Sequence, residues 1–236
     1  MFVNPRINGV LEVLLNKNPQ DISQEDITEI QTIAFTKAQE DGQQVYSINE
    51  VLNFQNLKHI YIESSEIFQE DIEKLSQIPT LSSIEFSKCI LDSNLDFSNF
   101  AQLRNLTVEG SYIEDPKFLS TLNNLKKLAV IFPYNEEADI NISDIKCGET
   151  LEELRLEGCC IENATSLSQL PNLKVLNFLS TEVPHFEFID ALPQLNQITV
   201  EPRYASNEKL QIPSLVVHTS DLHLVMDDKD YSRKIV

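Results

Sequence analysis

The sequence predicts an α/β solenoid of stacked short units, each made of one strand and a helical or irregular return. Three observations predict this fold class. A phrase L-x-x-[L/I]-x-apolar recurs at intervals of 22 to 27 residues. Each copy alternates apolar with other residues, which is the period of a strand with one buried face. Further apolar residues recur three and six positions before each copy, so every unit carries a stripe that only a stacked neighbour can bury.

The repeated phrase marks one predicted strand per unit. Its copies are LKHIYI (57–62), LSSIEF (81–86), LRNLTV (103–108), LKKLAV (125–130), LEELRL (151–156), LKVLNF (173–178) and LNQITV (195–200). A looser copy, IQTIAF, starts at Ile30. Residues 22–202 are therefore predicted to hold about eight repeats.

The segments that flank the repeats are predicted to close the two open ends of the stack, because uncapped ends expose strand edges and apolar rungs. Residues 1–21 are predicted to be a helical cap, and 203–236 a cap and tail with one further rung and a frayed end. The predicted N-terminal helix has an apolar stripe of Val10, Leu11, Leu14 and Leu15. The SQED segment (23–26) has the order of a capping box and should start the next helix.

These residues resemble the leucine-rich repeat family, in the 22-residue form common in bacterial proteins. The resemblance implies a curved solenoid, with a parallel sheet on its concave face and short helical or irregular returns on its convex face. It also implies that the concave face binds another protein. One column departs from the family, which usually places Asn three residues after the last apolar strand residue. Here that column reads Ser65, Cys89, Ser111, Pro133, Cys159, Thr181 and Arg203, so the turns should be satisfied in another way.

The charge of the chain limits its partners. It has 37 acidic and 18 basic residues, for a formal net charge of −19. Nucleic-acid binding needs a basic footprint and is excluded, and adhesion to an anionic membrane is disfavoured for the same reason. A basic protein partner would be attracted by this field. The alternative is that the acidity only keeps the surface solvated.

The sequence also predicts a cytoplasmic protein with reduced thiols. The N-terminal segment lacks the layout of a signal peptide, and no apolar run has the length of a membrane span. Cys89 and Cys159 fill the same column three repeats apart, roughly 14 Å at the spacing of strands, which is too far for a disulfide.

No catalytic motif is present, so the chain is predicted not to be an enzyme and to need no cofactor or metal. His218, Asp221 and His223 lie close together but fit no standard metal site. Cys147 or Cys160 would need a positioned base to act as a nucleophile, and the sequence supplies none.

The predicted binding site is the set of strand positions between and just beyond the apolar ones, because these point away from the core. The residues predicted to form this site are Tyr61, Glu63, Glu85, Thr107, Glu109, Ile131, Phe132, Tyr134, Arg155, Glu157, Asn177 and Leu179. This face is predicted to be basic where strands begin and acidic where they end. The alternative role for those charges is cross-strand pairing. Ile131, Phe132 and Tyr134 are predicted to form an exposed hot spot. The alternative is that Phe132 and Tyr134 form the private core of the longer loop.

Taken together, the patterns predict a non-catalytic protein-binding module with a basic protein partner. One concrete version is an immunity or inhibitor protein that neutralises a basic toxin or enzyme. The alternatives are a substrate-recognition subunit, a remnant of an effector whose catalytic domain is absent, and a purely structural module.

Overall fold

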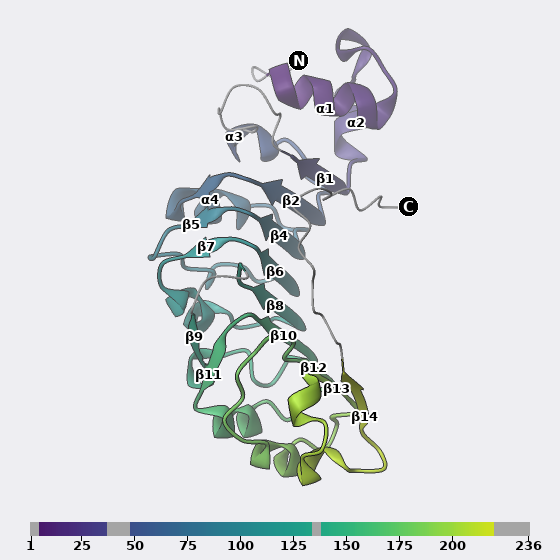
Figure 1. The fold of residues 1–236 in the computed structure, drawn as a ribbon. Coiled ribbons are helices and arrows are strands. Elements are labelled where there is room, and N and C mark those ends of the chain that lie inside the picture. The colour runs from purple at the N-terminus through teal and green to yellow at the C-terminus, as the bar shows by residue number, and fades with distance from the viewer. Residues whose placement is uncertain (1–4, 37–47, 134–137, 220–236) are drawn as a thin grey trace, which may run out of the picture.

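The computed structural model of the chain describes residues 5–36, 48–133 and 138–219. Nine strands form one parallel sheet that runs the length of the molecule (Figure 1). The strands follow one another across this sheet in the order in which they occur in the sequence. They are β1 (Thr32–Phe35), β2 (His59–Glu63), β4 (Ser83–Ser87), β6 (Asn105–Glu109), β8 (Lys127–Ile131), β10 (Glu153–Glu157), β12 (Val175–Asn177), β13 (Gln197–Val200) and β14 (Val216–Thr219). The first eight overlap the predicted phrases, so the solenoid fold class is confirmed.

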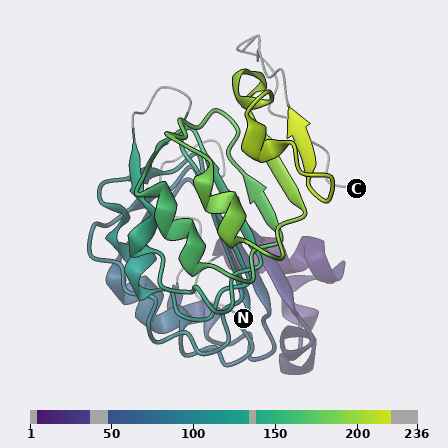
Figure 2. The same ribbon diagram turned by 90° about the horizontal axis from the view of Figure 1, so that it is seen from below.

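The returns form a second layer behind the main sheet (Figures 1 and 2). Five short strands lie there, in one sheet of order β3-β5-β7 and another of order β11-β9. Their bounds are β3 (Glu66–Ile67), β5 (Ile90–Leu91), β7 (Tyr112–Ile113), β9 (Asp139–Asn141) and β11 (Cys160–Glu162). The helical pieces are α3 (Ile48–Val51), α4 (Gln69–Leu75), η2 (Pro116–Thr121), η3 (Ile142–Asp144), η4 (Ala164–Gln169), η5 (Glu187–Ala191), η6 (Pro202–Tyr204) and η7 (Glu208–Leu210).

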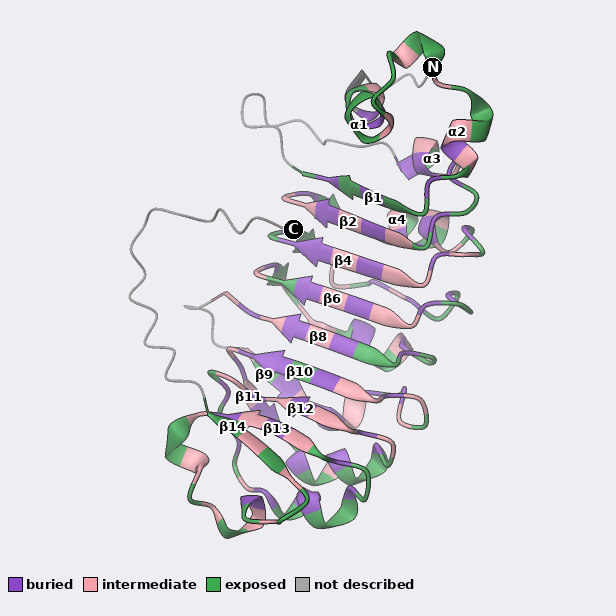
Figure 3. Cartoon of the chain, turned by 90° about the vertical axis from the view of Figure 1, so that its right-hand side faces the viewer, coloured by how far each residue is buried: buried purple, intermediate pink, exposed green. Residues whose placement is uncertain are grey.

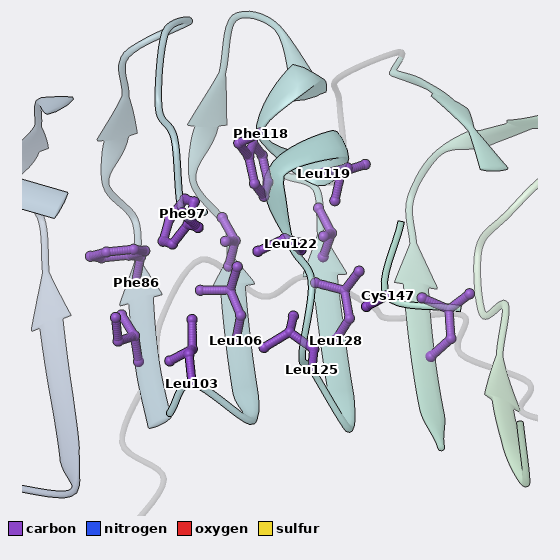
Figure 4. Packing of buried hydrophobic residues seen from close by; sticks show 14 of the residues in the cluster. Phe86, Phe97, Leu103, Leu106, Phe118, Leu119, Leu122, Leu125, Leu128 and Cys147 are labelled. Atoms are coloured by element: carbon purple, nitrogen blue, oxygen red, sulfur yellow. The ribbon is translucent and has the colours of Figure 1, made fainter. Parts of the chain in front are cut away.

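The core fills the space between the sheet and the returns and continues from unit to unit. Strand residues alternate between buried and partly exposed, as the bands along the arrows of Figure 3 show. In the middle of the stack, Leu106 and Leu128 occupy registered positions on β6 and β8 and are both 1% exposed. Figure 4 shows them with Phe118 of η2 in one cluster of side chains. Burial of such rungs is the main stabilising contribution in a solenoid.

Three helical segments precede the first strand: α1 (Pro5–Leu15), η1 (Pro19–Asp21) and α2 (Gln24–Thr28). Ile7 and Leu11 of α1 are buried, whereas Leu14 is 51% exposed. The predicted stripe was therefore wrong at Leu14, because the buried face of the helix lies on the side of Ile7 and Leu11. The capping box of α2 is confirmed: Asp26 N–H donates to Ser23 Oγ at 3.1 Å, and Ser23 N–H donates to the Asp26 carboxylate at 2.9 Å. That these helices cap the stack stays a prediction.

At the other end, β14 pairs in parallel with β13 and adds one further strand to the sheet. That residues 203–236 cap the stack stays a prediction. The predicted frayed tail, together with Asp221 and His223, lies outside the described residues.

The turns after β2, β4, β6, β10 and β12 each hold one residue with positive φ. It lies two positions after the last apolar residue of the repeat's strand, and the five residues are Ser64, Lys88, Gly110, Gly158 and Ser180. The residue that follows is buried in each of these turns and replaces the Asn of the family. Cys89 Sγ donates to the Ile62 carbonyl at 3.4 Å, and Thr181 Oγ1 donates to the Leu156 carbonyl at 2.7 Å. Hydroxyls and thiols thus satisfy turn carbonyls that water cannot reach.

Candidate concave binding face

The strand register brings most of the predicted site residues into two rows on the concave face. Tyr61, Glu85, Thr107, Ala129, Arg155, Asn177 and Thr199 are successive partners across the strands. Glu63, Ser87, Glu109, Ile131 and Glu157 form the next row. Because these positions alternate with the buried ones, both rows face away from the core. Leu179 lies two residues past the end of β12 and is half-buried.

The charges of the C-terminal half of this face, over β8, β10 and β12, are paired with one another. Lys126 and Lys174 lie 3.0 and 2.6 Å from the two carboxylate oxygens of Glu152. These hydrogen bonds hold the pKa of the Glu152 carboxyl down at about 2. Lys127 pairs with Glu153 at 2.7 Å. Cross-strand pairing, the alternative role for these charges, therefore describes this half.

Arg155 and Glu157 complete that pairing within a single strand. Arg155 Nε and Nη2 donate to the two carboxylate oxygens of Glu157 at 2.6 and 3.1 Å. Glu157 is only 8% exposed. The expectation that it points freely to solvent was wrong, because side chains two apart on a strand share a face and this guanidinium covers the carboxylate.

The N-terminal half of the face, over β2, β4 and β6, holds acidic side chains that are not balanced in this way. Glu63 pairs with Lys88 at 3.2 Å, whereas no ion pair to Glu85 or Glu109 is found among the described residues. Burial raises the pKa of the Glu85 carboxyl, the charge of Glu109 raises it further, and His59 lowers it. Glu85 is thus a half-buried carboxylate whose ionised form is disfavoured by its surroundings.

Tyr61 lies beside this acidic pair, since it is the registered neighbour of Glu85. Burial also raises the pKa of its phenol. At neutral pH it therefore presents a partly covered ring and a neutral hydroxyl. His59, at the start of the same strand, contacts Ser83 Oγ through Nδ1 at 2.9 Å.

The predicted hot spot at the end of β8 was wrong for Phe132. Its side chain is only 7% exposed, and its N–H donates to the Glu157 carbonyl at 3.0 Å. A Cβ added at Gly158 would lie 3.2 Å from the Phe132 carbonyl oxygen, so the two chain segments pack closely. Phe132 thus belongs to the main core cluster of the solenoid, whereas the alternative placed it with Tyr134 in a private core of the loop. Ile131 is half-buried on the concave face. Tyr134 lies outside the described residues.

The buried cysteines are unsuited to nucleophilic chemistry. No disulfide joins the four cysteines, of which Cys89, Cys147 and Cys159 are buried and Cys160 is half-buried. Burial raises the pKa of the Cys147 thiol to about 11 and that of Cys159 to about 12. At neutral pH both are protonated thiols, which react slowly.

Within residues 5–36, 48–133 and 138–219, no group of three or more His, Cys, Asp or Glu side chains is placed to hold a metal ion. In the same ranges, no helix has the length and apolar character required to cross a membrane.

Comparison with known proteins supports the fold. No protein-family model matches the chain, and no curated protein matches it. Among solved structures it is similar to internalin C2 from Listeria monocytogenes, with 18% sequence identity, a TM-score of 0.55, and coverage of 84% of this chain and 93% of that one. It is also similar to an internalin F from the same organism, with 16% identity, a TM-score of 0.33, and coverage of 94% and 92%. At such identity, the first likeness bears on the architecture alone.

Proposed function

Since the chain has the leucine-rich-repeat fold, we propose that it is a protein-binding module that holds a basic protein partner on the N-terminal half of its concave face. The observation that carries the proposal is the acidic pair Glu85 and Glu109 beside Tyr61. Neither carboxylate forms an ion pair among the described residues, although the C-terminal half of the same sheet neutralises its own charges.

The raised pKa of the Glu85 carboxyl indicates that its ionised form lacks a stabilising partner. A half-buried carboxylate has lost part of its hydration, and the neighbouring charge of Glu109 adds repulsion. A Lys or Arg side chain from a partner would offset both effects through charge-assisted hydrogen bonds. Tyr61 would add apolar contact area at low cost in side-chain entropy, as tyrosines do in interfaces.

The proposal also covers the cellular compartment of the protein and the kind of partner it binds. The four cysteines form no disulfide, which is in keeping with a reducing compartment, and we propose the cytoplasm. An immunity or inhibitor protein that neutralises a basic toxin or enzyme is one form of this proposal. Its support is the acidity of the chain and of this face.

The test is affinity capture from the source cell, followed by association kinetics with the captured protein. The site variant is Glu85→Gln with Glu109→Gln. Its matched control is Glu149→Gln with Glu162→Gln, which changes the charge equally at exposed positions outside the two concave rows. The site variant should slow association by about tenfold at low salt, with a smaller loss at high salt. Charges at an interface mainly raise the rate at which the partner is attracted to it, and salt screens that attraction.

Two outcomes would refute the proposal. One is capture of an acidic partner. The other is association of the site variant at the same rate as the control. Circular dichroism of all the variants is the control that checks whether each one keeps the fold.

A further inference from the structure

A second exposed surface lies on the small sheet β3-β5-β7 of the return layer. Ile90 and Tyr112 are registered partners on β5 and β7, and they are 51% and 52% exposed. The alternate residues Ile67 and Leu91 are 1% and 2% exposed, so they point into the core. One face of the small sheet therefore anchors it, and the other presents large apolar side chains to solvent. We call Phe68, Ile90 and Tyr112 the flank stripe.

Phe68 extends this stripe across the third strand. It is 47% exposed and follows β3 at an extended backbone angle. It stands two residues after Glu66, the registered partner of Ile90, and so shares its face. Such diagonal neighbours are within reach of aromatic side chains. Single exposed apolar residues are ordinary, but three on neighbouring returns, two of them in register, are grouped on one side of the small sheet.

A hollow opens at the Phe68 end of the stripe. It has a volume of about 360 Å³ and is lined by Phe68, Gln69, Glu70, Asp71 and Asp92. Asp71 accepts a hydrogen bond from Phe68 N–H at 3.0 Å, which fixes the first turn of α4 next to the hollow. The hollow therefore combines an aromatic wall with carboxylates and is open to solvent.

The charge around the stripe defines the chemistry of its occupant. Residues 66–72, 90–94 and 112–115 hold six Asp and Glu residues and no Lys or Arg. Two of these six carboxylates are already paired, Glu70 with Lys74 and Asp115 with Lys117, and Lys88 pairs with Glu63 outside the three segments. A second copy of this chain would bring acid against acid, which opposes pairing of two flank stripes.

We propose that the flank stripe is a second protein-docking surface, which takes a cationic amphipathic segment with large apolar side chains between Lys or Arg residues. The apolar side chains cover Ile90 and Tyr112 and enter the hollow at Phe68, while the cations meet the carboxylates around it. This surface lies on the return layer and shares no residue with the acidic pair of the concave face, so the two sites are separable.

The test uses a fluorescent synthetic peptide of alternating Lys and Leu and measures its anisotropy with the full chain. The site variant is Ile90→Ser with Tyr112→Ser. The matched control is Val13→Ser with Leu14→Ser, which removes two exposed apolar side chains from α1. The site variant should bind the peptide about tenfold more weakly than wild type, as loss of buried anchors predicts, whereas the control should bind as wild type does.

Three further measurements separate the explanations. A peptide of alternating Lys and Ser should bind much more weakly, and equal binding would reduce the effect to charge and overturn the proposal. In a chain that already carries Glu85→Gln and Glu109→Gln, Ile90→Ser with Tyr112→Ser should still weaken peptide binding about tenfold, so failure of the concave site does not affect this result. Sedimentation velocity over a range of concentrations tests self-association. A dimer that the site variant abolishes would assign the stripe to a second copy and overturn the cationic occupant.

Discussion

The two halves of the concave sheet share one backbone plan but differ in how their charges are used. Over β8, β10 and β12, each of Glu152, Glu153 and Glu157 has a cation within 3.1 Å. Over β4 and β6, Glu85 and Glu109 have no such cation among the described residues. The repeat therefore fixes which side chains face the concave surface, whereas the pairing between neighbouring strands decides which of them remain available to a partner.

The largest expected effect concerns Phe132, at the boundary between the halves. Phe132→Ala should lower the free energy of unfolding by roughly 3–5 kcal/mol, because it removes a buried ring from a packed site. Ile131→Ala, one residue away on the concave surface, should cost about 1 kcal/mol or less, since its side chain is half-buried. Chemical denaturation of both variants checks the contrast.

Equal stability of these two variants would contradict the burial of Phe132. A folded Phe132→Ala variant with weakened partner binding would return Phe132 to the binding site.

The second effect tests whether the halves share one framework. Leu106→Ala in β6 and Leu154→Ala in β10 should each cost roughly 2–5 kcal/mol, because both residues are 1% exposed rungs. Thermal unfolding by circular dichroism measures both. If either variant unfolds together with wild type, that leucine is not a packed rung, and the two halves do not share the same core.

These rungs could be predicted from sequence because the strand period is strict and each apolar column is repeated in register. Phe132 could not be placed by that rule, because the turn around it differs from those of the other repeats. Ser64, Lys88 and Gly158 occupy the equivalent turn position with positive φ, and Phe132 is not among the described residues with positive φ. The signal was Pro133, since a residue before proline is driven to extended backbone.

The positions of the charged residues could be predicted from the sequence, but the ion pairs between them could not, for a different reason. The columns of Lys and Glu were visible in the sequence, but pairing depends on side-chain reach between neighbouring strands. Arg155 and Glu157 stand two apart on one strand, so their shared face was predictable, whereas the depth to which the guanidinium covers the carboxylate was not. The exposed flank stripe was missed because Ile90 and Tyr112 fall between the repeated columns.

The third prediction contrasts a paired with an unpaired acid. Arg155→Ala should cost roughly 1–3 kcal/mol, because it leaves the covered Glu157 carboxylate without its donor. Glu109→Gln should change stability little, because it removes an exposed charge with no ion pair among the described residues. Urea denaturation of both variants at neutral pH is the measurement. A stable Arg155→Ala variant would mean that water replaces the guanidinium at Glu157.

The smallest expected effect, and the sharpest in sign, is the pH dependence of Glu85→Gln and Glu152→Gln. The pKa of the Glu85 carboxyl is raised in the folded chain. Its contribution to stability is therefore fully present below the unfolded pKa and is lost as pH rises through the folded pKa. The pKa of Glu152 is lowered from 4.5 to about 2, so its contribution is present above 4.5 and is lost as pH falls toward 2.

At pH 7 the Glu85→Gln variant should therefore melt at or above the temperature of wild type, and the Glu152→Gln variant below it. Both differences should vanish in acid, that of Glu85 once its carboxyl is protonated and that of Glu152 only near pH 2. Glu149→Gln, at an exposed position outside the two concave rows, is the control for the loss of one charge. If both variants lose stability equally at pH 7, the two halves of the face do not differ in their charge balance. The acidic pair would then have a structural role, and the concave site would lose its main support.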